Sequence, residues 1–320
     1  MGVYEKTPAH YSYDSVARFA GHVQLKGLMP RSVEAYLAVV RILAQWAGED
    51  PAALGEERVR EFFLHLVRER GYAPKSLRQA RAALVAFYRD MPGRAQWRVF
   101  DEVKTKDREQ LPVVLSREEV RRILTEVKEL RYAVPLRLIY LCGLRLSEAL
   151  HVEVRDIHRA EQRLHIREGK GGKDRCVPLP AAALDALEEW WRWHRHPRFL
   201  FPAMGHAWRA TERRDAAEQA RVQRARLRAA EHPMSTSGLQ RVFQIALAAS
   251  GVRKRATIHT LRHSYATHLL EEGVSIRYVS QYLGHATLEQ TLVYAHLTAV
   301  SDAQTQQAVA RLATALHAGA

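Results

Sequence analysis

A polar, charged stretch at residues 101–112 separates two regions in which apolar residues recur at helical spacing, and this division most constrains the fold. Upstream of it, the helical spacing holds across residues 14–90 and predicts four short helices. Proline and glycine stand at the expected helix ends: Pro30, Pro51, Gly71 and Pro74. We therefore predict a helical domain over residues 1–100, a linker over 101–112 and a second domain over 113–320.

The second region mixes helices with a small amount of β-structure. Ser116 and Glu119 form an S-x-x-E capping pair that predicts a helix directly after the linker. Further along, two short runs at residues 163–167 and 175–179 flank the glycine-rich, basic segment 168–174, a pattern typical of a β-hairpin. The expected fold class is mainly α, with a small β-hairpin or sheet in the second domain.

Composition excludes several classes of protein. The chain is 47% hydrophobic and 26% charged, which is ordinary for a globular protein and excludes a disordered or collagen-like chain. No run of about 18 apolar residues is present, and the N-terminus has no apolar secretory core, so we expect a cytoplasmic protein with no membrane partner. Two cysteines, Cys142 and Cys176, are too few for a disulfide framework or a thiolate zinc site. We expect no metal or other cofactor.

The charge balance indicates a polyanionic partner. Lys and Arg number 49 against 35 Asp and Glu, a formal net charge of +14, which suits nucleic acid, although a basic protein without such a partner has the same charge. Segment 203–232 carries seven arginines between Arg209 and Arg228, and it is either a solvated helix face or a contact to the DNA backbone. The same two alternatives hold for the basic residues of the fourth helix: Lys75, Arg78 and Arg81.

Six residues of the second domain, taken in sequence order, are of types that could carry out catalysis. The set is Arg145 in GLRLSE, Lys170 in the hairpin tip, His259 and Arg262 in HTLRH, His285 in LGH, and Tyr294 in LVYAH. Singly, each has a commoner role. Arg145 could pair with Glu148 on a helix surface, Lys170 and its neighbour Lys173 could contact phosphates, and the histidines, including His263, could be buried and structural. Tyr278 and Tyr282 are further tyrosines in the same region.

Taken in order, these motifs resemble those of the tyrosine recombinase family, the phage-type integrases, which includes chromosome-dimer resolvases and integron integrases. The resemblance covers residues 115–298, and the helical N-terminal half resembles the family's core-binding domain. It implies a DNA strand-cleaving and rejoining enzyme with no cofactor. In this family a tyrosine forms a covalent 3′-phosphotyrosyl link to DNA, and Tyr294 takes that position.

The resemblance also implies roles that suit the residue types. Arg145 and Arg262 would clamp the negative charge that gathers on the attacked phosphate, because guanidinium groups donate paired hydrogen bonds. His259 resembles the acid–base histidine near the phenol, Lys170 the proton donor to the departing 5′ oxygen, and His285 a donor to the phosphate. Glu148 would orient Arg145.

The family resemblance implies an assembly on double-stranded DNA. Val309, Leu312 and Leu316 predict a last amphipathic helix that would dock on a neighbouring subunit, giving a homo-tetramer on two duplexes; folding back on its own domain is the alternative. Accessory proteins are possible further partners. Two other functions stay open: a type IB topoisomerase acting on one duplex, and a non-catalytic DNA-binding regulator.

Overall fold

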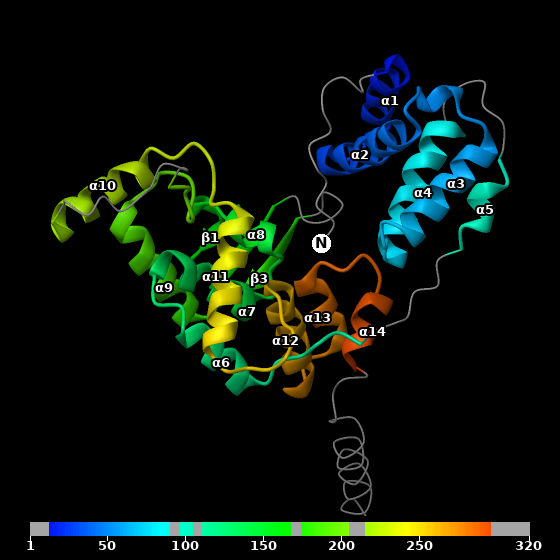
Figure 1. The fold of residues 1–320 in the computed structure, drawn as a ribbon. Coiled ribbons are helices and arrows are strands. Elements are labelled where there is room, and N and C mark those ends of the chain that lie inside the picture. The colour runs from blue at the N-terminus through cyan, green and yellow to red at the C-terminus, as the bar shows by residue number, and fades with distance from the viewer. Residues whose placement is uncertain (1–12, 90–96, 105–110, 168–173, 205–214, 296–320) are drawn as a thin grey trace, which may run out of the picture. The chain divides into compact units, whose positions relative to one another are not determined.

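The computed structural model describes residues 13–89, 97–104, 111–167, 174–204 and 215–295 (Figure 1). The chain divides into two compact units, Met1–Gln110 and Leu111–Ala320. None of the described helices combines the length and the apolar character that a membrane crossing requires.

The first unit is a helical bundle. Its elements are α1 (Asp14–Leu25), α2 (Pro30–Ala47), the short 3-10 helix η2 (Pro51–Ala53), α3 (Glu56–Arg68), α4 (Pro74–Tyr88) and α5 (Val99–Glu102). The four predicted helices are confirmed as α1 to α4, and Pro30 and Pro74 occupy the first turns of α2 and α4, where a missing N–H costs nothing. Phe19 and Phe87 meet edge to face in the core, with ring centroids 5.2 Å apart.

Helix α5 was not predicted, because four residues are too few to show a helical period. Asp101 and Glu102, which the sequence analysis placed in the linker, lie in this helix. Arg81 of α4 holds α5 in place: its Nε donates to the Phe100 carbonyl and its Nη2 lies 3.6 Å from Asp101. The Arg81 side chain is therefore engaged within its own unit, whereas Lys75 and Arg78 are exposed.

The second unit is also mostly helical. Its helices are α6 (Arg117–Thr125), α7 (Leu130–Cys142), α8 (Leu146–Leu150), η3 (Val154–Asp156), α9 (Ala181–His194), α10 (Ala216–Arg228), α11 (Thr236–Ala249), α12 (Ile258–Glu271), α13 (Ile276–Leu283) and α14 (Glu289–Ala295). The predicted capping pair of α6 is confirmed. The Ser116 hydroxyl accepts from the Glu119 N–H at 3.1 Å, and the Glu119 carboxylate accepts from the Ser116 N–H at 2.7 Å. Helix α10 lies within the arginine-rich segment, and its Leu227 is buried.

A three-stranded antiparallel sheet completes this unit. Its strands are β1 (Ile157–His158), β2 (Arg163–Ile166) and β3 (Arg175–Pro178), in the order β1-β2-β3. The predicted hairpin is confirmed as β2 and β3, with the buried residues Leu164 and Val177 directly opposite each other. Strand β1 was missed because two residues are too short to alternate. The hairpin tip with Lys170 and Lys173, and the C-terminal Val309, Leu312 and Leu316, lie outside the described residues.

Helix α7 forms the centre of this unit. It packs against α12 and α9, and buried residues occur around most of its circumference, including Leu136, Ile139 and Cys142. Gly143 ends it in the left-handed region, with φ of 62°. The chain can therefore turn directly from the buried helix into Arg145 and α8.

Replacing Gly143 with alanine is expected to lower the free energy of unfolding by about 3 kcal/mol, the sum of a left-handed backbone cost and overpacking. A Cβ atom at this position would lie 2.5 Å from two ring carbons of Tyr265. Gly273→Ala is the matched control, because φ is +81° there but no atom lies within 4 Å of the added Cβ. The control is expected to cost about 1 kcal/mol. Urea denaturation of both variants measures the difference, and equal losses would contradict the steric argument.

Candidate active site

The ends of several helices converge on one site in the second unit. Arg145 directly precedes α8, Arg262 lies on α12, His285 follows α13, and Tyr294 lies on α14. Helices α12, α13 and α14 pack against one another (Figure 1). Residues up to 149 positions apart in sequence are thereby brought together, and four of the six predicted residues lie around one centre, where Glu148 contacts the arginines.

The Glu148 carboxylate organises the arginines of this site. It accepts from Arg145 Nη1 at 2.6 Å and from Arg175 Nη1 and Nη2 at 3.0 and 2.7 Å, and it lies 3.7 Å from Arg262 Nη1. Burial opposes ionisation of Glu148, but the hydrogen bond and charge of Arg175 and the hydrogen bonds from Arg145 lower its pKa to about 2. Glu148 is therefore a permanent anion that holds three guanidinium groups at one place.

Arg175 is a residue that sequence reasoning missed. It opens β3, its side chain is 7% exposed, and its Nε donates to the Tyr282 carbonyl at 2.8 Å. In the sequence it is one more basic residue at the end of a basic hairpin tip, with no signal of burial. Its contact with Glu148 arises only because β3 packs beside α13.

Arg262 is almost completely buried, at 1% exposure. Its Nη1 donates to the Gly143 carbonyl at 2.7 Å and its Nη2 donates to the Leu283 carbonyl, while Arg145 Nη2 donates to the adjacent Gly284 carbonyl at 3.2 Å. Burial, with the charge of Arg145, lowers the pKa of Arg262 to about 9, so it remains charged at neutral pH. Two cationic groups are thus fixed side by side, an arrangement that suits a phosphate.

The phenol of Tyr294 lies beside these cations. Tyr294 is 4% exposed, and its hydroxyl is 2.7 Å from Nδ1 of His263. Burial raises the pKa of Tyr294, while the positive charges of Arg262 and Arg145 act in the opposite direction. The phenol therefore stays protonated in the free protein, and forming a phenolate here requires a proton acceptor.

His263, rather than His259, is the histidine in hydrogen-bond contact with the phenol. The exposed His259 packs edge to face against His263, with ring centroids 4.4 Å apart. Burial, together with the charges of His259 and Arg262, lowers the pKa of His263 to about 4, so its ring is neutral at pH 7. The signal that could have found His263 is its spacing: it follows His259 by four residues and therefore shares a helix face with it.

His285 also contacts the ring of Tyr294. Its ring stacks on Tyr294 at an interplanar angle of 18°, and its Nδ1 lies 2.7 Å from the Thr291 hydroxyl. Burial and the charges of Arg262 and Arg145 lower the pKa of His285 to about 4. A neutral ring whose Nδ1 accepts from Thr291 keeps an Nε2–H to donate. Within the described part of the chain, no group of three or more His, Cys, Asp or Glu side chains could hold a metal ion.

Similarity to known proteins extends over most of the chain. Residues 113–300 match the model of the phage integrase family, and residues 16–97 match the phage integrase N-terminal SAM-like domain. An integrase/recombinase of Escherichia coli is 34% identical over 303 residues, which cover 85% of this chain and 86% of that protein. The chain belongs to the phage integrase family.

Further tyrosine recombinases are similar to this chain in sequence or in fold. The tyrosine recombinase XerA of Thermococcus kodakarensis is 31% identical over 289 residues, covering 88% of this chain and 90% of that protein. A lambda integrase dimer bound to a COC′ core site matches with a TM-score of 0.67 at 15% identity, covering 88% of this chain and 93% of that chain; this shows the shared fold.

Members of the family cleave and rejoin DNA through a tyrosine intermediate, and membership makes this chain a site-specific DNA recombinase. The resemblance noted in the sequence is thereby confirmed for the family, the fold class and the type of enzyme. The two alternatives, a type IB topoisomerase and a non-catalytic regulator, are not favoured.

Proposed function

We propose that Tyr294 is the nucleophile of this recombinase and that Arg145 and Arg262 bind the phosphate it attacks. The observation that carries the proposal is a phenol hydrogen-bonded to a neutral histidine, beside two guanidinium groups fixed by one buried carboxylate. These are the parts that a metal-independent phosphoryl transfer needs: a nucleophile, a proton acceptor and fixed positive charge.

In the proposed reaction, Tyr294 Oη attacks phosphorus and its proton passes to His263. The bond from phosphorus to the 5′ oxygen breaks, and a 3′-phosphotyrosyl link forms. Arg145 and Arg262 stabilise the charge on the non-bridging oxygens, and His285 Nε2–H donates to the same phosphate. By the family resemblance, Lys170 protonates the departing 5′ oxygen. Attack by a 5′ hydroxyl of the partner duplex reverses these steps, so rejoining needs no external energy source.

The proposed assembly is a homo-tetramer on two duplexes of double-stranded DNA. A lambda integrase tetramer bound to a Holliday junction has the same fold, with a TM-score of 0.66 at 16% identity. By analogy, the segment with Val309, Leu312 and Leu316 would join neighbouring subunits. Lys75 and Arg78 of α4 and Lys173 of the hairpin tip would contact backbone phosphates. Accessory proteins would then decide between integration, excision and dimer resolution.

The test is recovery of a covalent complex. The full chain is expressed with DNA and denatured in detergent and chelator, and protein-bound fragments are sequenced while the attached residue is mapped. We expect a DNA 3′ end linked to Tyr294, with the fragment ends giving the recombination site. Sequence-specific binding without any adduct would contradict the proposal.

His263→Ala is expected to slow adduct formation by about 10²–10⁴-fold, the usual contribution of a positioned proton acceptor. His263→Asn is expected to recover part of this loss, since its amide oxygen can accept the phenol hydrogen bond but cannot take up the proton. Adduct formation is timed by quenching with detergent, and DNA affinity serves as the control that should not change. An unchanged rate in His263→Ala would assign the histidine a structural role only.

A further inference from the structure

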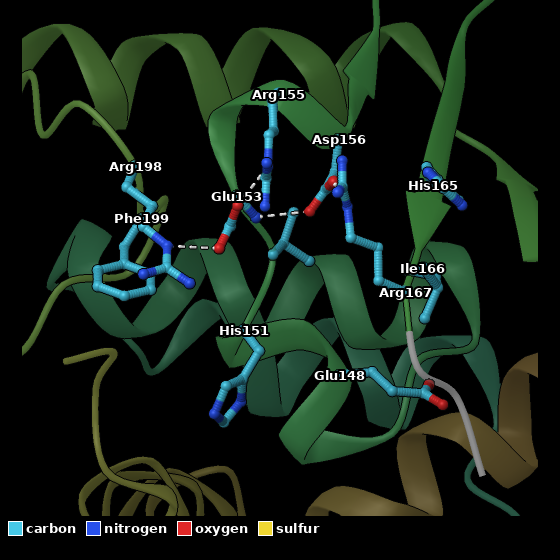
Figure 2. A pocket seen from close by; sticks show the side chains of 11 residues that line it. Glu148, His151, Glu153, Arg155, Asp156, His165, Ile166, Arg167, Arg198 and Phe199 are labelled. Atoms are coloured by element: carbon cyan, nitrogen blue, oxygen red, sulfur yellow. Dashed lines mark hydrogen bonds and ion pairs between the residues drawn. The ribbon is translucent and has the colours of Figure 1, made fainter. Parts of the chain in front are cut away.

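Two buried carboxylates next to the active site hold three arginines that the reaction does not use. Glu153 is the N-cap of η3 and Asp156 is its last residue, and their side chains are 9% and 4% exposed. Glu153 accepts from Nε of Arg155 and Nε of Arg198, both at 2.6 Å, and Asp156 accepts from Nε of Arg167. Figure 2 shows Arg155 and Arg198 reaching Glu153 from different segments. We call Arg155, Arg167 and Arg198 the arginine rim.

The arginine rim presents unused hydrogen-bond donors. Each guanidinium is held through Nε, and within the described residues no hydrogen bond uses the terminal nitrogens of these three side chains. The side chains of Arg155 and Arg198 are 65% and 63% exposed, while the carboxylates that hold them are buried. The Arg198 guanidinium also lies over the Phe199 ring, 4.8 Å from its centroid. Such side chains are oriented before any ligand arrives, which reduces the entropy lost on binding.

The rim surrounds a cavity that reaches the active site. The cavity has a volume of about 250 Å³, and its walls include Glu148, His151 and His165 beside the rim (Figure 2). Glu148 is the carboxylate that organises the catalytic arginines, and Arg167 directly precedes the hairpin tip with Lys170. The arginine rim is therefore adjacent to the proposed catalytic groups, both at Glu148 and along the chain at Arg167.

The same device operates at both places. At the catalytic centre, buried Glu148 fixes Arg145 and Arg175; at the rim, buried Glu153 fixes Arg155 and Arg198. Burial opposes ionisation of Glu153, but hydrogen bonds from Arg198 and Arg155 lower its pKa, so the carboxylate stays charged. Within the rim, three cations face two anions, and Glu148, which also lines the cavity, is already paired with Arg145 and Arg175. Forked guanidinium groups suit phosphate oxygens.

We propose that the arginine rim binds backbone phosphates flanking the one that is cleaved, and that Glu153 and Asp156 are positioning residues for it. The proposal rests on the proposed function, since the DNA strand that enters the catalytic centre is the strand the rim would hold. Continuity with that centre and the high exposure of Arg155 and Arg198 favour an extended phosphate backbone over a small enclosed anion.

The first experiment measures DNA affinity of the full chain at several salt concentrations, with the duplex recovered from the adduct. In the Arg155→Ala/Arg198→Ala double variant, the slope of log affinity against log salt should fall by about two, one per lost phosphate contact. The control is Arg159→Ala, whose side chain is 71% exposed and paired with Glu188 but does not line the cavity. Its slope should not change. An unchanged slope in the double variant would overturn the proposal.

Glu153→Gln separates positioning from simple charge. The variant removes one negative charge from the protein. If the arginines acted through charge alone, without being oriented by Glu153, this variant would bind DNA more tightly. We expect weaker binding, by about threefold to tenfold, because the amide keeps one acceptor oxygen but loses the negative charge and the second acceptor that hold the two arginines. The Arg155→Lys/Arg198→Lys variant gives an independent check, because both positions are exposed and the fold should tolerate the change. Lysine keeps the positive charge but lacks the forked guanidinium group, so DNA affinity should fall. Tighter binding by Glu153→Gln, or an unchanged affinity in the lysine variant, would overturn the proposal.

Two further outcomes distinguish the possible failures. If inorganic phosphate binds the free protein and the double variant loses only that binding, the rim is a small-anion site and the proposal is wrong. If the unmodified chain forms no adduct, the proposed function fails, whatever the rim does. An adduct on Tyr294 combined with an unchanged salt slope overturns the rim alone.

Discussion

Phenylalanine at position 294 is expected to abolish strand cleavage and the covalent protein–DNA adduct, a loss of at least about 10⁴-fold, because it removes the attacking oxygen of the proposed nucleophile. The fold should survive the change. It removes one hydroxyl and its hydrogen bond to His263, a cost of about 1 kcal/mol. DNA affinity should stay within about twofold of the unmodified protein, since the arginines proposed to bind phosphate are untouched.

Tyr278→Phe is the matched control for this variant. Tyr278 is 55% exposed on α13, close in sequence to Tyr294, and makes an aromatic contact with Tyr282. Its loss should leave the adduct yield unchanged. Adduct formation is measured on the same duplex for all three proteins after denaturation. An adduct that persists in Tyr294→Phe and disappears in Tyr278→Phe would reassign the nucleophile.

Patterns that depend on local chemistry could be predicted from the sequence. The Ser116–Glu119 capping pair and the hairpin runs at residues 163–167 and 175–179 depend on neighbours along the chain, and the structure confirms them as a capping box and as strands β2 and β3. The order of Arg145, His259, Arg262, His285 and Tyr294 also indicated one site. Four of these five side chains lie around the same centre, and His259 lies one ring away, against His263.

Contacts made only by tertiary packing could not be predicted. Arg175 enters the site because β3 passes beside α13, and nothing in its neighbouring sequence distinguishes a buried arginine from the basic hairpin tip. Likewise, the pairing of Glu153 with Arg198 joins residues 45 positions apart. His263 differs, because its spacing from His259 and its adjacency to Arg262 were visible. Which of the two histidines contacts the phenol depends on where α14 places Tyr294, and this could not be read from the sequence.

Replacing Glu148 with alanine is expected to lower the free energy of unfolding by about 3–5 kcal/mol, because three guanidinium groups lose the anion between them. The side chains of Arg175 and Arg262 are 7% and 2% exposed, so water cannot easily replace the carboxylate. Glu118→Ala is the control. That glutamate is 60% exposed and paired with Arg121, and its loss should leave the free energy of unfolding nearly unchanged. Urea denaturation compares the variants.

The dependence on pH tests whether charge, rather than packing, underlies the role of Glu148. Its pKa is about 2 in the folded chain against an ordinary value of 4.5, a difference that stabilises the folded state by about 3 kcal/mol. A lowered folded pKa gives stability that is complete above pH 4.5 and is lost as pH falls toward 2. Glu148→Gln lacks this contribution at every pH. The stability gap between the two proteins should therefore be widest at pH 7 and narrow steadily below pH 4.5, whereas a gap that stays constant down to about pH 3 would show that Glu148 acts through shape and hydrogen bonding alone.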